Sequence, residues 1–273
     1  MMNSNVPYAL RGMTAVPTES STLVSSSRFL NEPRLREWIA THCLRRSGKD
    51  IPTTADMYQL GALMRELHVH ERIEELFTAE RKAWPELDRW LSDGFISTFT
   101  VDDLLDYPPG SLGHIFGSYI QDNNFEVQII PPFEPKSQHE YYILRSAQTH
   151  DLEHIVFGGG FNILGELIPY YARLSNTPRF LGAELSGHVN IMQVLGSTRV
   201  MVRTGLHYHQ AFPTALKATQ HGMRVGEEAG PIFMYKFEDL FHLTIAEVRQ
   251  KLGLTTAFDF DSQEASLAWD EYR

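Results

Sequence analysis

The strongest constraint on the fold of this chain is the spacing of its apolar residues, which recur every three or four positions along most of its length. Leu35, Trp38 and Ile39, for example, fall on one face of a helix. Proline and glycine residues separate one such segment from the next. We therefore predict an all-α fold, a single-domain helical bundle with helices over 33–47, 53–67, 73–77, 85–91, 111–120, 140–156, 162–174, 179–195, 211–228 and 236–252.

The remaining segments carry weaker signals. A weakly alternating stretch from Phe125 to Pro135 leaves room for one short β-hairpin. Residues 1–30 are expected to be a disordered N-terminal arm, because the first 26 are rich in Ser and Thr; a transit peptide is the alternative. The helical domain then spans 31–255, and the acidic residues 256–273 are expected to form a flexible tail.

Composition excludes several classes of protein. A formal net charge of −10 disfavours the wrapping of nucleic acid, which needs clustered Lys and Arg. Cys43 is the single cysteine, so no internal disulfide can form. No run of 18 to 20 apolar residues occurs, so a membrane contact would be peripheral.

The segment 150–166 contains side chains that can bind a metal ion. On a helix, four residues advance by about 400°, so His150 and His154 lie on the same face and can reach one ion. Asp151 is about 100° away from His150 and can bend toward the same ion. Glu166 lies twelve residues after His154, roughly 18 Å along a continuous helix. The glycines at 158–160 allow the chain to turn back and bring Glu166 opposite the histidines.

Two imidazoles and two carboxylates suit Zn, Fe, Mn or Co and tolerate Mg. The alternative is a set of solvated surface ion pairs, but apolar flanks such as Ile155 and Leu167 favour a buried location, where charge needs a partner or a metal. Glu153 is either a fifth ligand, a solvent-facing acid or a partner of the ligands.

These residues resemble the hallmark of the coenzyme Q biosynthesis protein four family, which is His-Asp-x-x-His, eleven intervening residues and Glu. Further matching segments are Tyr107-Pro-Pro-Gly110-Ser-Leu-Gly113-His114, Arg145, Gly165-Glu166, Gly222, Gly226 and the closing helix Ala246–Leu254. Three departures leave open a divergent homologue, bacterial or mitochondrial, that acts on a different lipid or aromatic acid: Glu153 replaces an aromatic or apolar residue, Asn162 replaces Thr, and residues 127–139 form a longer Pro-rich insertion.

The resemblance implies an all-α fold, a hydrophobic groove for a polyprenyl chain, and peripheral membrane association within a ubiquinone-synthesising complex. It implies a metal-dependent decarboxylase acting on carbon 1 of a polyprenylated hydroxybenzoate, in an oxidative form with hydroxylation. The expected metal ligands and catalytic residues are His150, Asp151, His154 and Glu166. The ion would be divalent, with zinc first. Arg145 would bind substrate, or form a structural ion pair.

We further expect a homodimer in the cytoplasm, peripheral to the inner membrane, or on the matrix side of the mitochondrial inner membrane. Two other functions stay open: a non-catalytic prenyl-lipid-binding scaffold for other quinone-biosynthesis enzymes, and a His-Asp metal phosphohydrolase. His207, His209 and His221 are weaker metal candidates. The aromatic residues that line a lipid groove, or simply belong to the core, are Phe157, Phe161, Tyr170 and Tyr171.

Overall fold

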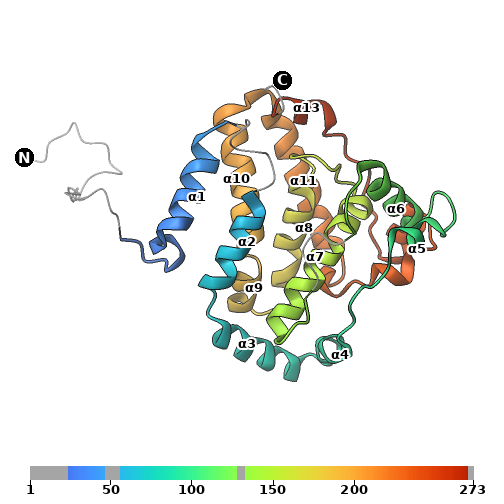
Figure 1. Ribbon diagram of the computed structural model, residues 1–273, viewed down its shortest axis with the longest axis horizontal. Coiled ribbons are helices and arrows are strands. Elements are labelled where there is room, and N and C mark those ends of the chain that lie inside the picture. Colours follow the sequence, from blue (N-terminus) through green and yellow to red (C-terminus); the bar gives the residue numbers. More distant parts are fainter. Residues whose placement is uncertain (1–23, 47–55, 128–132, 270–273) are drawn as a thin grey trace, which may run out of the picture.

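The computed structural model describes residues 24–46, 56–127 and 133–269, and over these ranges the chain forms one helical bundle (Figure 1). The N-terminal half of the bundle contains the helices α1 (Pro33–Leu44), α2 (Asp56–Leu67), α3 (His70–Ala83), α4 (Pro85–Asp93), α5 (Val101–Leu105) and α6 (Leu112–Asn123). The C-terminal half contains α7 (Gln138–Phe157), α8 (Leu167–Asn176), α9 (Ala183–Val189), α10 (Ile191–His207), α11 (Phe212–Glu228), α12 (Ile245–Lys251) and α13 (Gln263–Leu267).

The all-α prediction is confirmed. Within the described ranges the only β-type pairings are two isolated bridges, between Ser111 and Thr244 and between Gly159 and Phe260. The hairpin expected at 125–135 falls partly on residues 128–132, which lie outside the described residues, and its described flanks are irregular. No helix in the described part of the chain is long and apolar enough to cross a membrane.

Several helix boundaries differ from the predicted ones because polar residues end or restart helices locally. The helix expected over 179–195 is divided at Asn190, where α9 ends and α10 begins. The backbone of Asn190 leaves helical geometry, with φ of −96° and ψ of 0°, and its side chain forms no capping hydrogen bond. The helix expected over 236–252 starts only at Ile245, because Thr244 and Glu247 form a capping box.

The centre of the bundle is α8, which packs along α11 and contacts α7 and α10 (Figure 1). Two glycines one turn apart on α11 allow this close packing. A Cβ atom on Gly222 would lie 2.5 Å from the carbonyl oxygen of Ile168, and one on Gly226 would lie 2.2 Å from that of Ala172. The two helices can therefore touch through their backbones, which places α8 firmly behind α7.

Three groups of buried apolar residues hold the helices together. The largest group lies between α6, α7, α8 and α11; a second joins α3 and α4 to α7 and α9; and a third joins α1 and α2 to α10. Transfer of this apolar surface out of water is the main stabilising contribution to such a bundle.

The described part of the expected tail, residues 256–269, contacts the helical bundle. Trp269 is 1% exposed, and its ring stacks on Tyr208 with a 4.3 Å separation of the ring centroids. Nearer the start of the segment, the Glu228 carboxylate accepts hydrogen bonds from the backbone and hydroxyl of Thr256. An acidic composition therefore did not prevent packing, because one large aromatic side chain gains much from burial. Most of the arm expected at 1–30 lies outside the described residues.

Candidate metal centre

The two histidines of the motif lie one above the other on α7. Ser137 caps this helix by accepting a hydrogen bond from the backbone N–H of Glu140, and the helix continues unbroken to Phe157. The Nε2 atoms of His150 and His154 are 3.3 Å apart, and their ring centroids are 4.8 Å apart. The helical repeat thus produces the pairing that the spacing predicted.

A tight turn follows α7 and returns the chain to the histidines. Gly158 adopts a left-handed conformation with φ of 82°, which ends the helix. Asn162 then fixes the turn, because its side-chain oxygen accepts a hydrogen bond from the backbone N–H of Gly165 at 2.9 Å. Ser262 and Ser266 donate to the same oxygen. Asn162, one of the departures from the family pattern, therefore joins the turn to the C-terminal segment.

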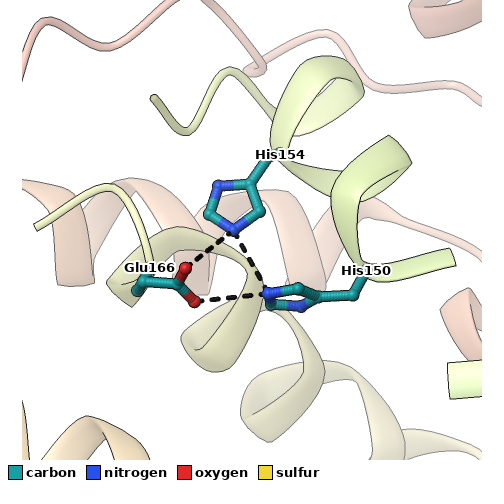
Figure 2. Close-up of side chains that lie close together, drawn as sticks. All are labelled: His150, His154 and Glu166. Atoms are coloured by element: carbon teal, nitrogen blue, oxygen red, sulfur yellow. Dashed lines mark hydrogen bonds and ion pairs between the residues drawn. The ribbon is translucent and has the colours of Figure 1, made fainter. Parts of the chain in front are cut away.

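Glu166 emerges from this turn directly before α8, facing both histidines (Figure 2). It was expected inside a helix from 162, but residues 161–166 form the turn itself. Its carboxylate oxygens lie 3.3 Å from His150 Nε2 and 3.5 Å from His154 Nε2. In the part of the chain that the structure describes, these three side chains form the one group whose ligand atoms all lie within 4.8 Å of one another.

The protonation of His154 suits a metal ligand. Its Nδ1 lies 3.2 Å from the carbonyl oxygen of Gly159. A carbonyl only accepts, so Nδ1 carries a hydrogen, and in the neutral form of the ring the lone pair of Nε2 faces Glu166 and His150. A backbone carbonyl that holds the other ring nitrogen is the usual support for a ligating histidine.

The electrostatics of the group favour a cation among the three side chains. Burial opposes ionisation of Glu166, yet the adjacent His154 and His150 hold the pKa of its carboxyl well below the usual range. Burial likewise disfavours a charged His154, but the Glu166 carboxylate raises the pKa of that imidazole. The buried carboxylate thus attracts positive charge, as a proton on an imidazole or as a metal ion. These residues fit a divalent cation.

The fourth expected ligand, Asp151, lies outside the converging group. Its side chain is half-buried beside the triad. Burial, with a smaller contribution from Glu166, raises the pKa of its carboxyl against the opposing effect of the histidines. Of the four ligands expected from the sequence, the structure brings three together, and Asp151 is their neighbour.

Glu153 is fully buried and faces away from solvent, so the solvent-facing alternative is wrong. Arg173 on α8 contacts both of its carboxylate oxygens, at 2.7 and 2.8 Å, and the Thr149 hydroxyl donates to one of them at 3.0 Å. This ion pair connects α7 to α8 next to His154. Arg173 was not predicted from the sequence. The signal that pointed to it was Glu153, an acid within an apolar segment, because a buried acid needs a cationic partner.

Arg145 is 1% exposed and is committed to protein partners. Its guanidinium lies 2.9 Å from one carboxylate oxygen of Glu238 and 3.2 Å from the other, and it also donates to the Ser97 hydroxyl and to Gln148. This geometry fits the structural ion pair, which was one of the two alternatives for this residue.

Aromatic rings cover one side of the triad. Phe161 stacks on His154 with ring centroids 5.1 Å apart, and Tyr119 stacks on Phe161 at 3.7 Å. Burial and the charges of Asp151 and Glu166 raise the pKa of Tyr119. Of the four aromatic residues considered for a groove, Phe161 and Tyr170 lie beside the triad, whereas Phe157 belongs to the core. Tyr119 was missed because it comes from α6, far away in the sequence.

Two of the weaker metal candidates, His207 and His221, contact backbone carbonyls, and the third, His209, is exposed. His207 Nε2 contacts the carbonyl oxygen of Cys43 at 3.3 Å, and His221 Nε2–H donates to the carbonyl of Phe157 at 2.8 Å. Within the described ranges no further His or Asp joins the triad, so the geometry does not favour a phosphohydrolase site.

The sequence of this chain is similar to that of a known protein family. The sequence model of a family described as coenzyme Q (ubiquinone) biosynthesis protein Coq4 matches residues 95–257, more than half of the chain. The matched region contains α7, the glycine turn and α8, and therefore the whole triad.

Two individual proteins are also similar. The mitochondrial ubiquinone biosynthesis protein COQ4 homologue of Aedes aegypti is 26% identical over 166 residues, 58% of this chain and 53% of that protein. This chain thus spans about half the length of the curated relative that it matches. A crystal structure of a candidate ubiquinone biosynthesis protein from Nostoc punctiforme aligns with a TM-score of 0.60 and 21% identity, covering 81% of this chain and 94% of the other. That likeness shows a shared fold.

Proposed function

Because this chain belongs to the coenzyme Q (ubiquinone) biosynthesis protein Coq4 family, we propose that it is a metal-dependent enzyme of ubiquinone biosynthesis that acts on carbon 1 of a polyprenylated hydroxybenzoate. The reaction breaks the bond between the ring carbon and its carboxylate, releases carbon dioxide and leaves the ring carbon to take a proton. An oxidative form would also install a hydroxyl at this carbon and needs an external oxidant.

The observation that carries this proposal is the convergence of His150, His154 and Glu166. Lone pairs on two imidazoles and a carboxylate repel one another unless a proton or a cation lies among them. The donor set favours zinc, with iron, manganese or cobalt as alternatives and magnesium as the least suited. Asp151 stays a proposed fourth ligand, since its carboxyl is electrostatically coupled to His150, His154 and Glu166.

A cation held by these residues would act as a Lewis acid and stabilise the negative charge that develops on the substrate as the carboxylate leaves. The protein positions and protects that chemistry. The Glu153–Arg173 ion pair holds α7 against α8, which keeps the histidines opposite Glu166. Phe161 and Tyr119 exclude water from one side of His154 and offer an apolar surface for an aromatic ring.

A second candidate function is a scaffold that binds prenylated intermediates for other enzymes of the pathway. Exposed apolar side chains favour this role: Val194, Leu206, Phe212, Leu216 and Met223 on α10 and α11 are each about 40% to 58% exposed. The same surface would serve contact with a membrane, a second copy of the chain or another ubiquinone-biosynthesis protein.

Turnover by the purified chain separates the two functions. The metal-loaded protein is given a prenylated 4-hydroxy-3-methoxybenzoate labelled in its carboxylate, and released carbon dioxide is counted. The proposal predicts release by the wild type and loss of release in Glu166→Gln, with Glu227→Gln as an exposed control. Wild-type protein that binds the prenylated acid but releases no carbon dioxide, with or without an added oxidant, would contradict the enzyme and support the scaffold.

A further inference from the structure

Four histidines from four separate segments lie together at the end of the bundle where α2 meets α3. His68 follows the last residue of α2, His70 begins α3, His139 is the second residue of α7, and His188 lies in the last turn of α9. In Figure 1 these helix ends meet at the lower end of the molecule. We call these four residues the histidine cluster.

His68 is the centre of the cluster. Its ring centroid lies 4.9 Å from that of His139, 6.4 Å from that of His70 and 6.5 Å from that of His188. The rings of His70 and His139 are 6.2 Å apart. Two imidazoles on one zinc ion, with Zn–N bonds of about 2.0–2.1 Å, have ring centres about 5 Å apart. His68 and His139 already have this separation, as do His150 and His154 at 4.8 Å.

The two central rings contain polar atoms that the protein leaves unpaired. His68 is 7% exposed and His139 is 2% exposed, and the Nδ1 atom of each is buried with no hydrogen-bond partner. A buried polar atom without a partner is costly, and few occur in a native protein. The two rings are adjacent, so a metal ion bound by both would remove part of this cost.

The outer two histidines can complete a ligand set. His70 is exposed and His188 is half-buried, so both can rotate and an ion can enter from solvent. The Nε2–H of His70 donates to the carbonyl oxygen of Arg65 at 2.7 Å, which leaves Nδ1 with the lone pair. As at His154, a backbone carbonyl thus selects the tautomer that binds a metal.

Neighbouring charges are compatible with a cation. Glu74 on α3 accepts hydrogen bonds from the backbone N–H groups of Gln138 and His139, and so fixes the start of α7 beside the cluster. Its carboxylate adds negative charge close to otherwise neutral rings. Burial, the other three histidines and, with the smallest effect, the opposing positive charge of Arg28 lower the pKa of His68, which keeps its ring neutral.

We propose that the histidine cluster is a second transition-metal site, with imidazole ligands only, which ties the α2–α3 corner to α7 and α9. A pure imidazole set selects zinc, copper or nickel over magnesium or calcium. Among the described residues, three ligand atoms lie within 4.8 Å of one another only at the triad. The four histidines of the cluster would therefore bind one ion together only after the side chains of His70 and His188 rotate.

This site would have a structural role. His68 and His70 precede the family-matched region at 95–257, whereas His139 and His188 lie within it. A metal would therefore cross-link the N-terminal helices to the part of the chain that carries the triad, and would stabilise the folded state by binding it in preference to the unfolded one. The inference is independent of the proposed enzymatic function.

Metal stoichiometry tests the inference. The full-length chain without a histidine tag is stripped with a chelator, returned to zinc, desalted and analysed for zinc per chain. We expect two zinc ions in the wild type and one in His70→Ala/His188→Ala, whose changes are at solvent-accessible positions and leave the core intact. His150→Ala/Glu166→Gln should also retain one, and the combination of all four changes should retain none. His209→Ala, at an exposed histidine outside the cluster, should retain two.

A thermal scan provides the second readout. Zinc should raise the melting temperature of His150→Ala/Glu166→Gln, and His70→Ala/His188→Ala should weaken zinc binding at the cluster at least tenfold. The inference would be overturned if the wild type binds one zinc ion per chain and His150→Ala/Glu166→Gln binds none. It would also be overturned if His70→Ala/His188→Ala still binds two zinc ions. If the wild type binds one zinc ion per chain and only His70→Ala/His188→Ala loses it, the result would support the histidine cluster and count against a metal at the triad.

Discussion

Glu153 and Arg173 form a buried, two-point ion pair that joins α7 to α8 one residue before the candidate ligand His154. Both carboxylate oxygens of Glu153 are contacted by the guanidinium, and the side chain of Glu153 has no exposed surface. The position of the triad His150, His154 and Glu166 therefore depends on a contact between side chains twenty residues apart in the sequence.

Breaking this ion pair on one side should destabilise the protein strongly. Glu153→Gln leaves the Arg173 guanidinium buried without its counter-charge, which costs about 3–5 kcal/mol. The double variant Glu153→Leu/Arg173→Met removes both charges and should recover most of that loss. Urea denaturation followed by circular dichroism measures the free energy of unfolding of each variant. If the free energy of unfolding falls equally in the single and double variants, then lost packing, and not the unpaired charge, causes the destabilisation.

Removing the carboxylate of the triad should weaken metal binding with little effect on the fold. Glu166→Gln keeps the shape of the side chain but removes the negative charge that attracts the cation, so we expect at least tenfold weaker zinc binding at this centre. Titration of the stripped protein in competition with a zinc indicator measures the affinity. Glu227→Gln is the matched control at an exposed position on α11. Identical affinities in the two variants would contradict the assignment of Glu166 as a ligand.

Replacement of the glycine that ends α7 should disrupt the turn to Glu166. Gly158 has a φ of 82°, and a Cβ atom there would lie 1.9 Å from the backbone oxygen of Phe258. Gly158→Ala should lose about 1–3 kcal/mol from the strained backbone alone, and more from the clash. Gly187→Ala is the matched control, since nothing lies within 4 Å of its Cβ position in α9 and alanine favours a helix by about 0.5–1 kcal/mol. Thermal unfolding of both variants should shift in opposite directions; a neutral Gly158→Ala would refute the proposed role of this turn.

Stability should fall as the pH decreases below about 6.5, partly because of His221. Burial of this imidazole, assisted by the positive charges of Arg249 and Arg224, lowers its pKa in the folded state. A histidine with a lowered folded-state pKa binds protons more readily when unfolded. Its contribution to stability is therefore complete above the unfolded pKa near 6.5 and is lost as the pH falls toward the folded pKa.

The control is His221→Gln, which can still donate to the Phe157 carbonyl but does not titrate. Chemical denaturation at pH 7.5 and at pH 5 should show a smaller pH-dependent loss in His221→Gln than in the wild type. The same loss in both proteins would assign the effect to other histidines.

Local sequence determined the helical class of this protein and the pairing of the two histidines in the candidate metal site. The three- and four-residue spacing of apolar side chains is itself the helical repeat, so it predicted α7 and α11 within a few residues. His150 and His154 are one helical turn apart, and the glycine at 158 can adopt a positive φ, so both halves of the motif depended only on nearby backbone geometry. The restart at Thr244 is also local, because Thr244 and Glu247 form a capping box within four residues.

Tertiary structure alone decided which charged groups are buried and with which partners. Glu153 meets Arg173, and Arg145 meets Glu238, through contacts between elements whose approach no local spacing encodes. Asp151 lies outside the converging triad for the same reason, because the direction of a side chain depends on what packs around it. The histidine cluster combines four segments spread over more than a hundred residues. Such contacts arise only when apolar burial brings distant helices together, and burial is a property of the whole fold.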